Sequence, residues 1–179
     1  EQLRLTEKTY DGFVRAGALL SAEQKQRLKQ INSRLSELSV TFAENLLAEN
    51  NAYTLEVAVD SLVGLPPTVR DAALDAGEAR GRKGRYIFTL HKPSMIPFLT
   101  YAKNRALRRE IYEAYLTRCN HDDEHDNKAV VSEMARLRSE KARLLGYDSY
   151  AAYVTADEMA GTPEAVYAVL DEIWTPALE

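Results

Sequence analysis

The pentapeptide HDDEH contains residue types at a spacing that could bind a catalytic metal. It matches the H-x-x-E-H pattern of one class of zinc peptidases. On a helix, His121 and His125 would share one face, so both imidazoles could bind zinc while Glu124 acts as general base. The surrounding residues are poor helix formers, however, and no other segment offers an obvious third ligand. The alternative interpretation is a solvated acidic loop in which Asp126 or Asn127 caps the next helix.

Two other groups of side chains have a chemical interpretation. Tyr147, Tyr150 and Tyr153 could line a peptide channel with their hydroxyl groups, or could be half-buried core residues with outward hydroxyls. A basic turn at residues 80–85 could contact phosphates, but we expect an ordinary solvated turn. His91 follows an expected strand and is interpreted as a strand-end residue. The pattern alone therefore assigns no catalytic or metal-binding residue, and substrate-binding residues stay unknown.

The first half of the chain predicts two helices and then a small sheet. Helical spacing covers residues 1–17, and Ser21 with Gln24 forms a capping box that opens the longest helix. Alternating or β-branched residues predict strands over 53–59 and 85–90, separated by a short alanine-rich helix that Gly77 weakens. Along the long helix, apolar residues recur every three or four positions and predict a core stripe: Leu28, Ile31, Leu35, Leu38 and Phe42.

The second half predicts helices only. They run from Ile96 to Arg118, over about 128–145, from about Ser149, and from a Thr162 cap with Pro163 at the first helical position. The predicted fold class is mainly α, with seven or eight helices and one small two- or three-stranded sheet. We expect a single unit over 1–179, divided into a helical hairpin (1–52), a small sheet with a short helix (53–92) and further helices (93–179).

Composition limits the classes of function. The 179 residues are enough for one domain or for part of a larger one, and the net charge of −4 argues against a nucleic-acid binder. No apolar run is long enough to cross a bilayer, so no membrane partner is expected. The single cysteine excludes an internal disulfide and fits a reducing compartment. The chain starts without methionine and stops within a helical pattern, so both ends are expected to be cut.

Five blocks of the sequence resemble one known family. They are FVRAGALLS (13–21), LSELSVTFAENLLAENNA (35–52), AKNRALRREIYEAYLTR (102–118), the DN pair at 126–127, and RLRSEKARLLGYDSYAAY (136–153) with MAGTPEAV (159–166). In this order they resemble the thimet oligopeptidase-like zinc metallopeptidases. The AENLLAENNA and AGALLS wording is most similar to the peptidyl-dipeptidase, or dipeptidyl carboxypeptidase, branch. The family's H-E-x-x-H zinc helix does not occur in this sequence.

The resemblance implies that the chain is a fragment upstream of the zinc motif, in a larger helical peptidase. The parent would use zinc to remove C-terminal dipeptides from short peptides, while this fragment would hold no zinc, be inactive alone and form part of the substrate-channel wall. Its partners would be the remainder of its own chain, with the catalytic zinc domain, and short peptides. A cytoplasmic location is expected, with the periplasm left open.

Two alternatives remain at this point. One is a helical protein-interaction module that binds a partner helix along the stripe from Leu28 to Phe42. The other is a self-contained zinc peptidase that uses His121, Glu124 and His125.

Overall fold

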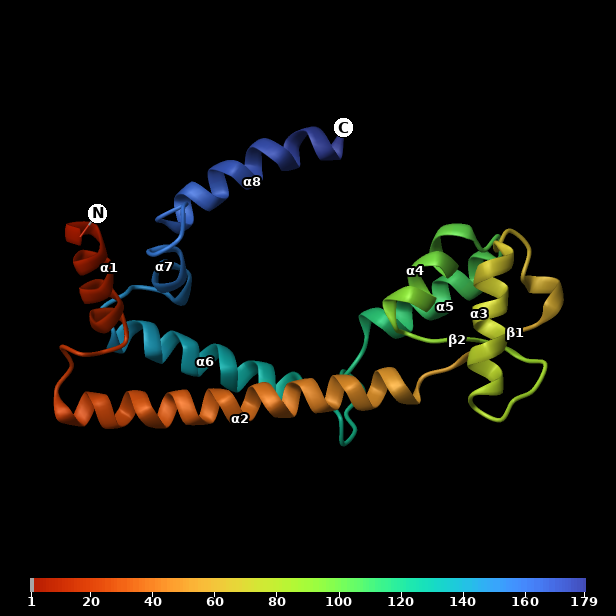
Figure 1. Ribbon diagram of the computed structural model, residues 1–179, viewed down its shortest axis with the longest axis horizontal. Coiled ribbons are helices and arrows are strands. Elements are labelled where there is room, and N and C mark those ends of the chain that lie inside the picture. Colours follow the sequence, from red (N-terminus) through yellow and green to blue (C-terminus); the bar gives the residue numbers. More distant parts are fainter. Residues whose placement is uncertain (1) are drawn as a thin grey trace. The chain divides into compact units, whose positions relative to one another are not determined.

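The computed structural model describes residues 2–179, which form eight α-helices and one two-stranded sheet (Figure 1). This confirms the predicted mainly α fold. Within the described residues, no helix is both long and apolar enough to cross a membrane. The elements are α1 (Gln2–Arg15), α2 (Ala22–Ala52), β1 (Leu55–Val57), the short 3-10 helix η1 (Val59–Ser61), α3 (Pro67–Glu78), β2 (Tyr86–Phe88), α4 (Lys92–Tyr101), α5 (Arg105–Leu116), α6 (Lys128–Leu144), α7 (Tyr150–Thr155) and α8 (Pro163–Leu178).

Contacts between residues group the chain into two compact units. The central unit is Val40–Ala129, and the split unit combines Glu1–Ser39 with Val130–Glu179. Helix α2 contributes its first part to the split unit and its last part to the central unit. The three-part division at residues 52 and 92 stays a prediction.

The central unit has a closed apolar core around its sheet. Strands β1 and β2 are antiparallel, with Leu55 opposite Phe88 and Val57 opposite Tyr86. The rings of Phe88 and Phe98 lie 4.4 Å apart between centroids, and Ile111 of α5 is fully buried beside them. The remaining buried members of this core are Leu62, Leu65, Ala73, Leu90, Met95 and Ala102.

Gly77 allows α3 to pack closely against the chain that leads into β2. A Cβ atom at this position would lie 2.1 Å from the carbonyl oxygen of Arg85, which is far inside van der Waals contact. The sequence indicated only that this glycine weakens the helix, whereas α3 continues through it to Glu78. The glycine therefore exchanges helix propensity for a close backbone approach.

The single helix predicted from Ile96 to Arg118 is two helices, α4 and α5. The break is stabilised by the backbone N–H of Lys103, which donates to the carbonyl of Val63 at 2.9 Å. Asn104 then caps α5, because its side-chain oxygen accepts a hydrogen bond from the N–H of Leu107 at 3.2 Å. A contact with a residue 40 positions away thus interrupts an otherwise helical pattern.

In the split unit, α2 packs against α6. Ile31 and Leu38 of α2 and Leu137 of α6 form its buried cluster, with half-buried Leu35 and Met134 against them. The predicted core stripe is therefore buried at Leu28, Ile31 and Leu38, while Phe42 at its end is 36% exposed.

Ion pairs border this helix pair. Arg34 makes a two-pronged contact with Glu133, at 2.9 and 2.8 Å, and Arg27 does the same with Glu140, at 2.6 and 2.9 Å. The hydrogen-bonded carboxylates raise the pKa of both guanidinium groups above the ordinary range. These pairs link α2 and α6 at two places along the border of the buried cluster.

Two caps predicted from the sequence are confirmed. The N–H of Ser21 donates to Gln24 Oε1 at 3.0 Å, and the N–H of Gln24 donates to Ser21 Oγ at 3.2 Å, which is the predicted capping box. Thr162 accepts a hydrogen bond from the N–H of Ala165 at 3.2 Å and opens α8, with Pro163 as the first helical residue.

Candidate functional site

The histidine-rich stretch forms turns between α5 and α6 rather than a helix. The Nε2 atom of His121 lies 2.9 Å from Glu49 Oε1, and the N–H of His125 donates to Asp123 Oδ1 at 3.0 Å. The shared helical face on which both histidines could bind one zinc ion is therefore absent. Within residues 2–179, no group of three histidine, cysteine or acidic side chains is arranged to hold a metal.

Asp126 holds this loop together through charge and hydrogen bonds. Its carboxylate accepts the backbone N–H groups of Asp122 and Lys128, both at 2.8 Å. The ammonium group of Lys128 lies 2.7 Å from Asp126 Oδ2 and from Asp122 Oδ1. The hydrogen bond from the Lys128 side chain, followed by those backbone groups, lowers the pKa of Asp126 to about 2. Asp126 therefore closes the turn that leads into α6, while the predicted cap on the helix itself stays a prediction.

Cys119 lies beside this loop and is not an activated nucleophile. Its side chain is buried, and its backbone N–H donates to Glu49, the residue that also contacts His121. Burial, followed by the hydrogen bond with the Glu49 carboxylate, raises the pKa of the thiol to about 11. A reactive cysteine needs the opposite shift, so this thiol has a structural environment.

Two of the three tyrosines, Tyr147 and Tyr153, contact the side chain of Arg15 at the end of α1, and Tyr150 packs against Tyr153. The guanidinium of Arg15 donates to the Tyr147 hydroxyl at 3.1 Å and to the carbonyl of Tyr153 at 2.8 Å. Its Cζ atom also lies 4.8 Å from the centroid of the Tyr153 ring. All three tyrosines are half-buried, and Tyr147 meets Tyr153 edge to face. This arrangement fits the half-buried core interpretation and fastens α1 to the chain around α7.

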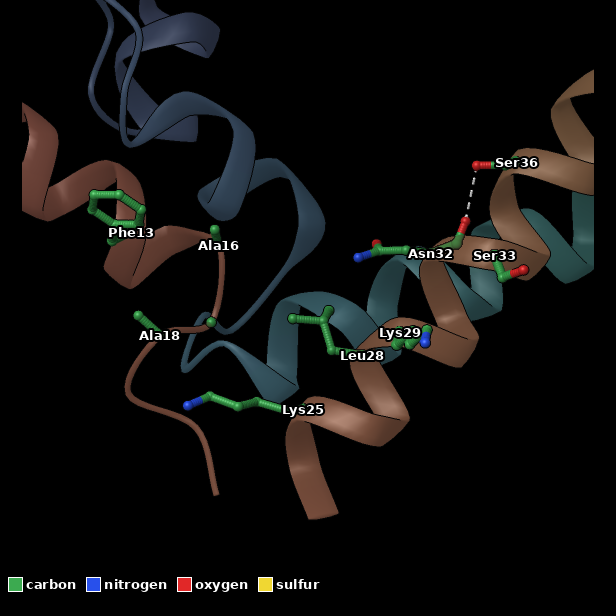
Figure 2. Close-up of a pocket in the computed structure, with 10 residues that line it drawn as sticks. Phe13, Ala16, Ala18, Lys25, Leu28, Lys29, Asn32, Ser33 and Ser36 are labelled. Carbon is green, nitrogen blue, oxygen red and sulfur yellow. Dashed lines mark hydrogen bonds between the residues drawn. The ribbon is translucent and has the colours of Figure 1, made fainter. Parts of the chain in front are cut away.

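A hollow of about 640 Å³ lies between the end of α1 and α2 in the split unit (Figure 2). One side is formed by the end of α1 and the following turn, through Phe13, Ala16, Gly17 and Ala18. The other side is α2, which contributes Lys25, Leu28, Lys29, Asn32, Ser33 and Ser36.

None of the residues that line the hollow is a histidine, a cysteine or a carboxylate, so the lining offers none of the usual zinc ligands. The oxygen of the Asn32 amide already accepts from Lys141 Nζ at 2.9 Å. Burial lowers the pKa of that lysine.

Two contacts that organise these regions had no signal in the sequence. Glu49 lies in the long helix, 72 positions before His121, and Arg15 lies more than 130 positions before the tyrosines it contacts. Both residues lie in blocks that carry the family resemblance, but their spacing indicates neither contact, so only the tertiary structure identifies these contacts.

The sequence of this chain is similar to those of known peptidases. The model of the family described as "Peptidase family M3" matches residues 98–179. Oligopeptidase A of Haemophilus influenzae is 38% identical over 177 residues, which cover 96% of this chain and 26% of that protein. Dipeptidyl carboxypeptidase of Salmonella typhimurium is 36% identical over 180 residues, 99% of this chain and 26% of that protein. The chain thus spans about a quarter of the length of the curated relatives it matches.

The two kinds of relative are about equally similar to this chain. A dipeptidyl carboxypeptidase from Escherichia coli is 33% identical over 97% of the chain, compared with 38% over 96% for the oligopeptidase A named above. The resemblance drawn from the five sequence blocks is confirmed at the level of the family.

Proposed function

This chain belongs to peptidase family M3, and from that premise we propose that it is a non-catalytic helical part of a zinc metallopeptidase. The parent enzyme would remove dipeptides from the C-termini of short peptides. One observation carries the proposal: the similarity covers 96 to 99% of this chain but only a quarter of each relative. The remaining three quarters of such a parent would then supply the reacting groups.

The residues of this chain do not fit a zinc site of their own. The Nε2 atom of His121 contacts Glu49, and the Nε2 atom of His125 lies 3.9 Å from Glu124 Oε1. Zinc in a peptidase needs three protein ligands that converge on one point. We therefore propose that the zinc of the parent is bound outside this chain, and no step of hydrolysis is assigned to residues 2–179.

The role proposed for this part is to support and restrict a peptide channel. Long helices held in alignment, such as α2 and α6 with their paired Arg34 and Glu133, form a wall that keeps its shape. A narrow walled channel would admit an unfolded short peptide and reject a folded domain. The parent is proposed to work in the cytoplasm, which fractionation of cells that produce the complete enzyme would test.

The interaction-module alternative has less support, because α6 covers the surface that it would use. The stripe that would receive a partner helix is buried against α6 of the same chain, with Ile31 at 0% and Leu38 at 3% exposure. A partner would have to displace α6 to reach it.

The experiment is a calorimetric zinc titration of the metal-stripped chain, together with a peptide hydrolysis assay. We expect this chain to bind no stoichiometric zinc and to release no dipeptides. The complete parent should bind zinc and release dipeptides. Binding of one zinc per chain that His121→Ala or His125→Ala abolishes would overturn the proposal and restore the self-contained zinc site. His91→Ala is the matched control, because His91 is the one histidine of this sequence that lies outside the loop.

A further inference from the structure

Helix α8, the blue helix at the C-terminal end in Figure 1, exposes almost all of its apolar surface. None of its residues is buried. Six large apolar side chains are between 51 and 70% exposed: Tyr167, Val169, Leu170, Ile173, Trp174 and Leu178. Contiguous apolar patches of this kind are rare on monomeric proteins and mark surfaces that another structure covers.

These side chains form one continuous face. With about 100° of rotation for each helical residue, they occupy an arc of about 180° from Val169 to Leu178. A helix at the surface of a domain needs an apolar stripe of only about 100°. The width of the arc indicates a helix that is covered from two directions, not one that lies on a single neighbour.

The opposite face of α8 is acidic. Glu164, Asp171 and Glu172 lie there, and the helix contains no lysine or arginine. Carboxylates thus border the apolar arc, and a complementary surface would carry lysine or arginine at its rim. A second copy of α8 could not supply those cations, and two acidic borders would repel each other.

We infer that the apolar face of α8 is the surface against which the rest of the parent peptidase packs. This inference rests on the proposed function, since the occupant is the part of the parent that this chain lacks. The chain spans about a quarter of its relatives, so ample chain exists to cover a helix from two directions. The covering surface is apolar at its centre and basic at its border.

The test produces residues 1–179 and the remaining parts of the parent enzyme as separate polypeptides, and measures their reassociation. Trp174 is the only tryptophan of this chain. Replacing it with 5-fluorotryptophan in this polypeptide alone gives a fluorine NMR signal that reports directly on the α8 face. Reassociation should shift this signal to that of a buried ring, and sedimentation should yield the affinity.

Two matched variants add the same charge to opposite faces of α8. Ile173→Asp places a carboxylate within the apolar arc, whereas Thr175→Asp places it on the acidic face. We expect Ile173→Asp to weaken reassociation by about tenfold or more, and Thr175→Asp to leave it nearly unchanged. Circular dichroism of each variant alone should match the unmodified chain, because neither position is buried there.

Equal affinity of both variants would overturn the inference. So would a fluorine signal that shifts only when the isolated chain dimerises, since the occupant would then be a second copy. These results are independent of catalysis. A parent that reassociates through α8 but hydrolyses no peptide would instead refute the proposed function.

Discussion

The two units of this chain differ in how completely they bury their own apolar surface. In the central unit, strands and helices enclose a core that includes Phe88, Phe98 and Ile111, each no more than 1% exposed. In the split unit, the buried cluster consists of Ile31, Leu38 and Leu137, while α1 and α8 contribute no buried residue. The central unit therefore encloses its apolar residues, whereas α1 and α8 of the split unit leave theirs exposed.

This difference between the two units concerns which segments cover their apolar faces. Leu3, Tyr10 and Phe13 of α1 have the spacing of a core-facing stripe, yet each is at least 59% exposed. Apolar spacing indicates that a face is built to be covered, and does not indicate which segment covers it. In the central unit the cover is within residues 40–129, and in the split unit part of it is proposed to come from the rest of the parent.

Truncating the centre of the closed core should have the largest effect. Phe98→Ala removes a fully buried ring that contacts Phe88, and should lower the free energy of unfolding by about 3–5 kcal/mol. Ile96→Ala, two residues earlier in α4, removes a side chain that is 51% exposed and should cost far less. Urea denaturation of the isolated chain measures both, and equal losses would contradict a closed central core.

The corresponding truncation in the split unit should cost less. Ile31→Ala removes a fully buried side chain from a smaller cluster with half-buried neighbours, which can close up around the gap. We expect a loss of about 2–3 kcal/mol in the same denaturation experiment. Val131→Ala, which truncates an exposed side chain of α6 in the same unit, is the control. A loss as large as that of Phe98→Ala would remove the contrast between the two units.

The ion pairs along α2 and α6 should contribute less than either core. A double-mutant cycle with Arg34→Ala and Glu133→Ala should show a favourable but small coupling that falls at high salt, because both side chains contact water. Arg109→Ala with Glu113→Ala gives a comparison within one helix of the central unit. A salt-independent coupling at Arg34 would mean that this pair is shielded from solvent.

The smallest effect concerns the loop before α6. Folding lowers the pKa of Asp126 from 3.8 to about 2, so its ionised form is favoured in the folded state. Its stabilising contribution is therefore complete above pH 3.8 and is lost as the pH falls through about 2. The stability difference between the unmodified chain and Asp126→Asn should shrink over that interval in acid titrations. A stability difference that stays constant across this interval would contradict the expectation.

The sequence predicted what neighbouring residues determine. The capping box of Ser21 and Gln24, the Thr162 cap and the two strands depend on residues within a few positions of one another, and all are present. It could not predict the break between α4 and α5, because the Lys103 N–H is held by Val63, from a distant part of the chain.

The same limit applies to the candidate site. A short motif suggested His121 and His125 as a pair, but Glu49 of a distant helix contacts His121, and turns replace the helix that the zinc alternative needed. Motif spacing has chemical meaning only when the local backbone has the assumed conformation.

Because Cys119 is buried, the rate at which its thiol is labelled reports on the opening of the central unit. A thiol reagent can attack this buried side chain only when the surrounding structure opens. When reclosing is fast, the labelling rate equals the rate for an open chain multiplied by the fraction of time spent open. Because the chain contains one cysteine, every labelling event reports on that single place.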